Sequence, residues 1–262
     1  MVQGSLSPFI TPEGAFIFTL SNNGYKFLTL NLVMHLRELK VPWTLCVICA
    51  DTASFKFFRG QNVPCIRTST PLPDFGIEVS PFGTKHFQTL NFKKLQLLEK
   101  FSNDPAIRFG IYMDGDIIPY SNFLPDILQR LQAPDASPIY LQCDENTRVD
   151  CSGNPGCPNG CTGFIAWSYG VDTRIFAVIG EEGLSIWKKR PEDQVYVNTM
   201  MNTLGILVKT LPRNLYPNGS FASLFYNGSL RKKDAFILHY NYLVGAAKQR
   251  KIKNNGDWIL PY

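Results

Sequence analysis

The sequence lacks any apolar run long enough to span a bilayer, which takes about 20 residues in a helix. Its first residues, MVQGSLSPFITPEG, lack the basic segment and apolar core of a secretory signal. A basic stripe interleaved with aromatic residues, typical of proteins that bind nucleic acid, is also absent. We therefore expect a cytoplasmic protein with no integral membrane segment and no nucleic acid partner.

Two glycine-rich phosphate-binding motifs are missing as well. No G-x-G-x-x-G follows the first predicted strand and no G-x-x-x-x-G-K-[ST] occurs, so neither a dinucleotide-binding fold nor a P-loop is predicted. What is present is an ordinary globular composition, with 45% hydrophobic and 18% charged residues among 262. The net charge of +5 is modest and suits an anionic small substrate as well as a nucleic acid.

The seven cysteines form two groups. Four of them lie in or shortly before the segment CSGNPGCPNGC (151–161) but lack the paired C-x2-C spacing of a structural zinc site. A local disulfide, or a tight loop with incidental thiols, is therefore favoured over zinc for Cys143, Cys151, Cys157 and Cys161. The remaining three lie in or near apolar segments and are expected to be reduced core residues: Cys46, Cys49 and Cys65.

Strand-like and helix-like patterns alternate through the first half of the chain. Compact apolar runs predict strands at 14–20, 43–50, 65–70 and 107–113. Helical spacing of apolar residues predicts helices at 25–39 and 92–101. This β-α-β-α-β order predicts an α/β fold with a mainly parallel, nucleotide-binding sheet flanked by helices.

The second half is less regular. Strands are expected at 138–143 and 162–169, a helix at 192–204, and an extended segment at 235–243. No linker long enough to divide the chain is visible, so a single domain over residues 1–262 is expected. Its nucleotide-binding half would cover about 14–120 and its more irregular half about 121–262.

Polar residues follow three of the predicted strands, at Asn22, at Asp51 and at the pair Asp114 and Asp116. Ligands of parallel sheets bind beyond the carboxyl ends of the strands, so a nucleotide-sized ligand is expected there. Two carboxylates two residues apart raise each other's proton affinity, and Mg²⁺ or Mn²⁺ relieves that conflict. Local sequence alone equally allows a plain turn at Asn22, a helix cap at Asp51 and a solvated turn at the aspartates.

Six ordered motifs carry a resemblance to a known family. They are TLSNNGY, NFKKLQLLEKF, YMDGDI, CTGFIAW, EDQVYVN and HYNYLVGAAKQRKIKNNGDW. From about residue 15 to 258 the chain resembles the nucleotide-sugar glycosyltransferases of the A-type fold, within the nucleotide-diphospho-sugar transferase family that includes plant α-xylosyltransferases and arabinosyltransferases. It departs from the family at Cys161, where Asn is usual, and at Gly115 inside the aspartate motif. Its size also resembles that of virus-encoded cytosolic xylosyltransferases.

The resemblance implies a UDP-sugar donor, with a pentose such as xylose favoured or a hexose, and a glycan or glycoprotein acceptor. It implies Mn²⁺ or Mg²⁺ on three ligands: Asp114, Asp116 and His239. It implies donor-binding roles for Thr19, Asn22, Tyr25, Asp51, Lys93, Asp114, Gly245 and Lys248. It implies that four residues line the sugar and acceptor pocket: Thr162, Gly163, Gln194 and Asn198. The neighbour of Lys93, Lys94, is expected to be solvated.

The resemblance leaves the role of Asp193 open. In an inverting enzyme Asp193 would be the base that deprotonates the acceptor hydroxyl. In a retaining enzyme it would bind sugar hydroxyls instead. Two other functions remain as alternatives, a nucleotidyltransferase and a non-catalytic module that binds nucleotide sugars.

Overall fold

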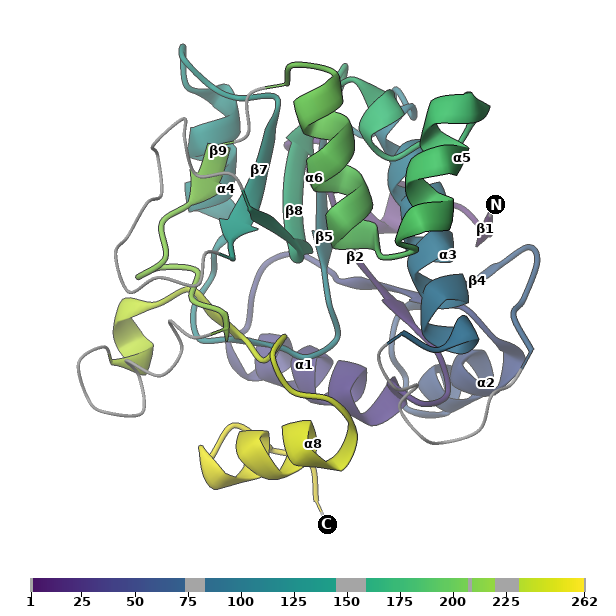
Figure 1. Ribbon diagram of the computed structural model, residues 1–262. Helices are drawn as coiled ribbons and strands as arrows, with labels where there is room; N and C mark the ends of the chain where they lie inside the picture. Colours follow the sequence, from purple (N-terminus) through teal and green to yellow (C-terminus); the bar gives the residue numbers. More distant parts are fainter. Residues whose placement is uncertain (1, 74–82, 145–158, 207–208, 220–230, 262) are drawn as a thin grey trace.

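The computed structural model describes residues 2–73, 83–144, 159–206, 209–219 and 231–261. Strands of this part of the chain form a mixed sheet in the order β1-β4-β3-β2-β5-β8-β7-β9 (Figure 1). Their bounds are Val2–Gln3 (β1), Ala15–Ser21 (β2), Cys46–Cys49 (β3), Cys65–Thr68 (β4), Phe109–Met113 (β5), Ile139–Cys143 (β7), Gly160–Ser168 (β8) and Lys209–Leu211 (β9). Strands β4, β3, β2 and β5 pair in parallel, whereas β8 is antiparallel to both β5 and β7.

Helices cover both faces of the sheet (Figure 1). Their bounds are Lys26–Glu38 (α1), Thr52–Gly60 (α2), Lys85–Ser102 (α3), Leu124–Gln132 (α4), Gly180–Lys189 (α5), Asp193–Thr203 (α6) and Gly245–Asn254 (α8). One hydrophobic core lies beneath α1, α2 and α4, and a second lies beneath α3 and α6. Because β2 is buried along its whole length, its side chains alternate between them: Ile17 belongs to the first core, and Phe16 and Phe18 belong to the second.

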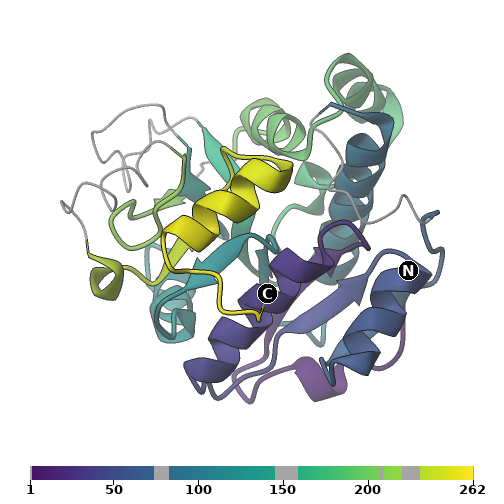
Figure 2. The ribbon, with the colours of Figure 1, turned by 90° about the horizontal axis from the view of Figure 1, so that it is seen from below.

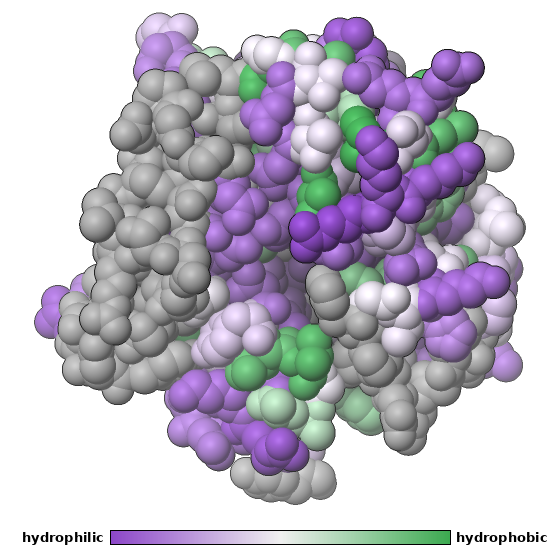
Figure 3. Space-filling model, in the orientation of Figure 1, coloured by the Kyte–Doolittle hydropathy of each residue, from purple (hydrophilic) through white to green (hydrophobic). Residues whose placement is uncertain are grey.

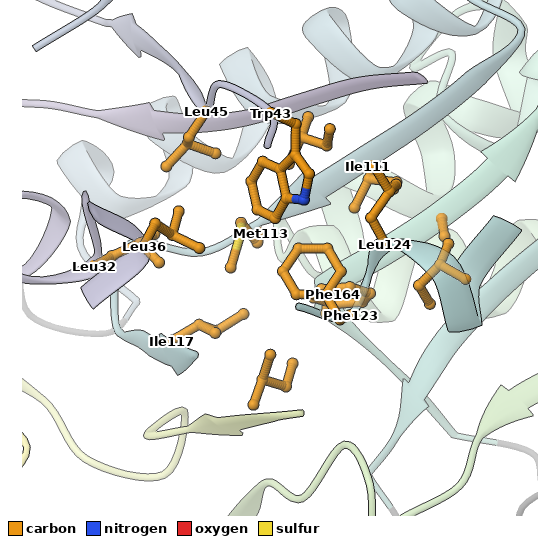
Figure 4. Packing of buried hydrophobic residues seen from close by; sticks show 14 of the residues in the cluster. Leu32, Leu36, Trp43, Leu45, Ile111, Met113, Ile117, Phe123, Leu124 and Phe164 are labelled. Atoms are coloured by element: carbon orange, nitrogen blue, oxygen red, sulfur yellow. The ribbon is translucent and has the colours of Figure 1, made fainter. Parts of the chain in front are cut away.

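Aromatic side chains fill the first core where α4 begins (Figure 4). The fully buried ring of Phe123 lies 5.1 Å from Trp43 and 5.3 Å from Phe164, measured between ring centroids. These contacts join the β2–β3 side of the core to β8. Phe123 therefore belongs to the packing that holds α4 against the sheet.

We expect Phe123→Ala to lower the free energy of unfolding by about 3–5 kcal/mol, because it removes buried apolar area and leaves a cavity. Urea unfolding followed by circular dichroism measures the change. Tyr169→Ala is the control, because the side chain of Tyr169 is 54% exposed and its loss should change stability by no more than about 0.5 kcal/mol. Equal losses for the two variants would contradict this description of the core.

A second, two-stranded sheet lies at the carboxyl edge of the first. It pairs β6 (Ile117–Pro119) with β10 (Ile237–His239) in antiparallel register, so that His239 stands opposite Ile117. Ile117 follows the aspartate motif directly, and the backbone N–H of Tyr240 donates to the carbonyl of Asp116 at 3.4 Å. This pairing brings His239, far along the chain from the aspartates, to the end of β5.

The C-terminal helix α8 lies beside α1 (Figure 2). Ile252 of α8 packs with Leu28 of α1 and with Tyr240. Beyond α8, the backbone carbonyl of Asp257 accepts a hydrogen bond from the Asn31 side chain of α1 at 2.9 Å. These contacts hold α8, and with it Lys248, over the carboxyl edge of the sheet.

The predicted α/β architecture is confirmed, with parallel pairing concentrated in the first half of the chain. Helix α3 begins at Lys85, seven residues before the predicted start at 92, because the side chain of Thr84 caps it by accepting from the Phe87 N–H at 3.3 Å. Helices α2, α4, α5 and α8 were not predicted. Within the residues described, no helix combines the length and the apolar character needed to cross a membrane.

Candidate active site

A cavity of about 1090 Å³ opens at the carboxyl end of β5 and the amino end of the antiparallel strand β8. Its walls come from α3, from the turn after β5, from β8, from α6 and from the segment between β10 and α8. In Figure 3 the hollow at the centre of this face is lined by hydrophilic residues. The polar motifs of the sequence therefore meet in one place.

The turn between β5 and β6 places the two aspartates in this cavity. Strand β5 ends at Met113, and the N–H of Ile117 donates to the Asp114 carbonyl at 3.2 Å, which closes the turn. Gly115 packs directly on α1, where a Cβ atom would lie 2.4 Å from Thr29 Oγ1. Any larger residue at 115 would push the turn away from α1, so glycine between the aspartates has a steric reason.

His239 completes a cluster with the two aspartates, and one ligand atom from each lies within 4.8 Å of the others. Its Nε2 is 3.3 Å from Asp116 Oδ1 and 3.7 Å from Asp114 Oδ2. The ring is 1% exposed, and no hydrogen-bond partner of Nε2 is present among the described residues. The cluster thus presents two carboxylates and one imidazole nitrogen to the same point.

This donor set fits a divalent cation. Neighbouring ligands of an octahedral ion with bonds near 2.1 Å lie about 3 Å apart, and the two observed separations need to close only slightly. Carboxylate oxygens with one imidazole suit Mn²⁺, and oxygen ligands suit Mg²⁺. The buried Nε2 is a further sign, because it faces the two carboxylates without forming a hydrogen bond among the described residues, and a cation between them would satisfy all three groups.

Gly163 makes room for the imidazole of His239. A Cβ atom at this position of β8 would lie 2.0 Å from His239 Cε1 and 2.8 Å from each ring nitrogen. The carbonyl of Gly163 also accepts the Asp114 N–H at 2.7 Å, so the same residue fixes the end of β5. Sequence reasoning placed Gly163 on the sugar pocket, and the structure adds this steric role beside the cluster.

The prediction that Lys94 is solvated was wrong. Lys94 is 5% exposed, and its Nζ lies 2.7 Å from Asp193 Oδ2 and 3.3 Å from Asp114 Oδ1. Lys93, the predicted donor-binding lysine, is not among the residues that line the cavity. Successive side chains of a helix point about 100° apart, so only one of two adjacent lysines can face the site.

The charges of the cluster shift several pKa values. Burial raises the pKa of Asp114 above its usual range, although Lys94 opposes the effect. Burial also opposes ionisation of Asp116, but the Lys248 ammonium in direct contact with it holds its pKa well below the usual range. Burial lowers the pKa of His239, but the Asp116 carboxylate and Cys161 raise it, to about 10 overall. The site therefore keeps both carboxylates close to several cationic groups.

Asp193 begins α6 and faces the same cluster. Its Oδ2 accepts from Lys94 and also from the Thr162 hydroxyl at 2.8 Å. Burial would raise the pKa of Asp193, yet Lys94 and these hydrogen bonds hold it below the usual range. Thr162 and Asp193 thus meet at the cavity wall, and Asp193 is an ionised, firmly positioned acceptor.

Five of the eight residues predicted to bind the donor lie outside the cavity lining: Lys93, Thr19, Asn22, Asp51 and Gly245. Asp51 caps α2, because its two oxygens accept from the Ser54 N–H at 2.7 Å and the Asn23 N–H at 2.8 Å. Asn22 accepts from the Tyr25 N–H at 3.0 Å, as expected of a turn residue. Thr19 is fully buried within β2 and points to the face opposite its lining neighbour Leu20.

Three predicted donor residues lie at the start of α1 and in α8. Tyr25 lines the cavity, and burial together with Asp116, Asp114 and Asp193 raises its pKa well above the usual value. Gly245 has a φ of +55°, which favours glycine for conformational reasons alone, and it is not among the lining residues. Lys248, one turn later on α8, does line the cavity.

The wall facing the cluster is rich in amides. Gln194 Nε2 donates to Asp144 Oδ2 at 2.8 Å, and Asn241 Nδ2 donates to the other oxygen of Asp144 at 3.1 Å. Asn198 fastens α6 to β8, because it accepts from the Gly160 N–H at 2.9 Å and donates to the Gly160 carbonyl at 2.8 Å. Sequence reasoning missed Asp144, which offers no local signal beyond following a strand.

Asn91 is a second lining residue that sequence reasoning missed. It lies one turn before Lys94 on the same face of α3, and its buried Nδ2 has no hydrogen-bond partner among the described residues.

Of the cysteine cluster, Cys143 and Cys161 are buried on neighbouring strands. Cys151 and Cys157 lie outside the described residues. Cys46 and Cys49 are buried thiols and Cys65 is a partly buried one, as predicted.

Comparison with known proteins identifies the class. Residues 44–254 match the profile of the nucleotide-diphospho-sugar transferase family, and the chain belongs to that family. This confirms the membership that the six motifs indicated.

Individual relatives are more distant. β-Arabinofuranosyltransferase RAY1 of Arabidopsis thaliana is 23% identical over 269 residues, an alignment that covers 94% of this chain and 48% of RAY1. The chain thus spans about half the length of this curated relative.

Solved structures share the fold. The galactosyltransferase LgtC, in complex with donor and acceptor sugar analogues, superposes with a TM-score of 0.60 at 11% identity and covers 94% of this chain and 97% of its own. The apo form of mouse xyloside xylosyltransferase 1 gives a TM-score of 0.53 at 11% identity and covers 86% and 97%. The chain therefore has the A-type glycosyltransferase fold predicted from its sequence.

Proposed function

We propose that this protein is a metal-dependent glycosyltransferase that moves a sugar from a UDP-sugar to a hydroxyl of a glycan or glycoprotein. The observation that supports this proposal most strongly is that three possible metal ligands meet at one point of the cavity: Asp114, Asp116 and His239. Lys94 and Lys248 flank them with positive charge. Family membership supplies the reaction class.

The cavity is large enough for this reaction. Its volume of about 1090 Å³ lies just above the usual range for small-molecule pockets, about 300–1,000 Å³. A donor of nucleotide size and an acceptor hydroxyl can share such a space. The names of the relatives RAY1 and xyloside xylosyltransferase 1 support a pentose as the transferred sugar.

In the proposed reaction the bond between the anomeric carbon and the phosphate oxygen breaks, UDP leaves, and the acceptor oxygen bonds to the anomeric carbon while its proton passes to an oxygen of the departing diphosphate. A Mn²⁺ or Mg²⁺ ion held by the two aspartates and His239 would stabilise negative charge on the departing diphosphate. Lys248 adds a point charge on the same side, since its ammonium contacts Asp116 directly.

Asp193 suits the binding of sugar hydroxyls better than proton abstraction. Its Oδ2 already accepts from Lys94 and Thr162, at 2.7 and 2.8 Å. A carboxylate in such contacts is held in its ionised form and is a weak base. We therefore propose a hydroxyl-binding role, which the anomeric configuration of the product tests: retention supports it, and inversion returns Asp193 to the role of base.

The donor is tested by thermal unfolding with UDP-, GDP- and CMP-sugars, each with and without Mn²⁺. A ligand that binds only the folded protein raises the apparent melting temperature by mass action. We expect a manganese-dependent rise with a UDP-pentose. A protein that no nucleotide sugar stabilises under either condition would contradict the proposal.

The two adjacent lysines of α3 provide a sharper test. Lys94→Met is expected to lower turnover about 100-fold, because it removes the cation between Asp114 and Asp193. The matched control is Lys93→Met, which removes a lysine one position away that does not line the cavity. Initial rates of UDP release measure both. Equal losses in the two variants would show that Lys94 has no special place in the site.

A further inference from the structure

The two ring nitrogens of His239 have opposite surroundings. Nε2 faces the aspartates, whereas Nδ1 lies 2.9 Å from Oε1 of Gln142 on β7. Gln142 is fully buried, and 97 positions separate the two residues in the sequence. No motif of the sequence includes Gln142.

The orientation of the Gln142 amide is determined by its other contacts. Its Nε2 donates to the carbonyl of Tyr216 at 3.1 Å and to that of Pro217 at 3.4 Å. A reversed amide would set its oxygen against two carbonyl oxygens and its NH₂ group against the imidazole. Oε1 must therefore face His239, and an amide oxygen can only accept a hydrogen bond.

The second neighbour of Nδ1 has the same polarity. Cys161 Sγ lies 3.7 Å from Nδ1, and this sulfur accepts from the Gly163 N–H at 3.4 Å and from Asn241 Nδ2 at 3.7 Å. The sulfur can also accept from an Nδ1–H group, which agrees with the Gln142 oxygen as its acceptor. In the neutral form of His239, which is the form that binds a cation, the proton of the imidazole belongs on Nδ1, and the lone pair of Nε2 is directed to the side of Asp116 and Asp114.

We propose that Gln142 is a positioning residue of the metal site, which fixes the Nδ1–H form of His239 and thereby aims the Nε2 lone pair at the cation. This inference rests on the proposed function, because it presupposes that Asp114, Asp116 and His239 hold a divalent ion. A partner of this kind raises the basicity of a histidine ligand and fixes its ring. Gln142 touches neither substrate nor metal and acts only through His239.

Two substitutions separate this role from simple packing. Gln142→Met and Gln142→Glu both lose the donors to Tyr216 and Pro217, so any loosening of the scaffold is common to them. Only Gln142→Glu keeps an oxygen that can accept from Nδ1. The probe is Mn²⁺ alone, titrated into the full chain, with free Mn²⁺ measured by electron paramagnetic resonance.

We expect Gln142→Met to weaken Mn²⁺ binding about 10- to 100-fold, and Gln142→Glu to bind as tightly as the wild type or more tightly. A double-mutant cycle covers the case in which Gln142→Glu does not fold. In a His239→Ala background, Gln142→Met should have no further effect on the residual Mn²⁺ affinity.

Equal affinities for the two Gln142 variants would overturn the inference, whether both are unchanged or both are weakened. So would the same loss from Gln142→Met with and without His239. A wild type that binds Mn²⁺ no better than His239→Ala would overturn the proposed metal site and this inference together. Binding that depends on His239 but not on Gln142 would overturn the inference alone.

Discussion

Asp116→Asn is expected to lower glycosyl transfer about 10³-fold, since a metal ligand supplies several kcal/mol of charge stabilisation and each 1.36 kcal/mol is tenfold in rate. Asp116 has one oxygen 3.3 Å from His239 Nε2 and the other in contact with Lys248. An asparagine would place its NH₂ group against one of these two nitrogen atoms. If the NH₂ group faces His239, the cation loses an oxygen ligand. If it faces Lys248, two donors stand against each other.

The control for this prediction is Asp172→Asn. Asp172 pairs with Arg174 on the surface, where such pairs contribute about 0–1 kcal/mol, and neither residue lines the cavity. Turnover is measured as UDP release at a temperature where melting curves show both variants folded, because breaking a buried pair also lowers stability. An Asp116→Asn enzyme as active as Asp172→Asn would remove Asp116 from the site.

Gly163→Ala is expected to lower the metal-dependent activity about 100-fold without unfolding the protein. A methyl group at 163 would lie 2.0 Å from His239 Cε1, far inside contact distance, so the imidazole must move. A displacement of about 1 Å at a catalytic site can cost about 100-fold in rate. Overpacking of this kind costs about 1–3 kcal/mol of stability, which leaves a folded protein to assay.

Gly60→Ala is the matched change for Gly163→Ala. Gly60 ends α2, has no left-handed backbone and would meet no atom within 4 Å of an added Cβ. Its substitution should leave activity unchanged and stability unchanged or slightly higher. Activity and Mn²⁺ affinity are compared at one protein concentration for both variants. The account of Gly163 is wrong if its alanine variant binds Mn²⁺ as the wild type does.

The strands of the first half could be predicted because a buried parallel sheet leaves a direct signal. Runs such as AFIFTLS and CVIC are apolar on both faces, and only sheets covered on both sides demand this. Helix α8 could not be predicted in the same way. Its residues read as a basic tail, and only Lys248 and Ile252, one turn apart, turn inward.

The choice between Lys93 and Lys94 shows a second limit of prediction from sequence. A motif gives the helix and the residue type but not the rotation of the helix about its axis, and one residue turns a side chain by about 100°. That rotation is set by packing of Leu95, Leu97 and Leu98 in the core beneath α3. The sequence therefore predicted a lysine of this helix in the site, and the structure turns Lys94 rather than Lys93 toward the cavity.

Local sequence was also insufficient where one residue type serves two purposes. Asp51 follows a strand, as a ligand-binding carboxylate would, but one of its oxygens caps the helix that begins at Thr52 and the other accepts from the Asn23 N–H of the loop after β2. Gln142 and Asp144 were missed for the opposite reason. Their partners His239 and Asn241 are each 97 positions away, and no pattern along the chain records that contact.

The central claim is that this cavity transfers a sugar from a nucleoside diphosphate in a reaction that needs the Asp114, Asp116 and His239 cluster. The most direct test is mass spectrometry of the products after incubation with UDP-sugars, Mn²⁺ and a panel of glycan and glycopeptide acceptors, with Asp116→Asn as the control. We predict one UDP released for each sugar added to an acceptor, and loss of both products in the variant. Release of pyrophosphate, or binding of the donor without any product, would contradict the claim.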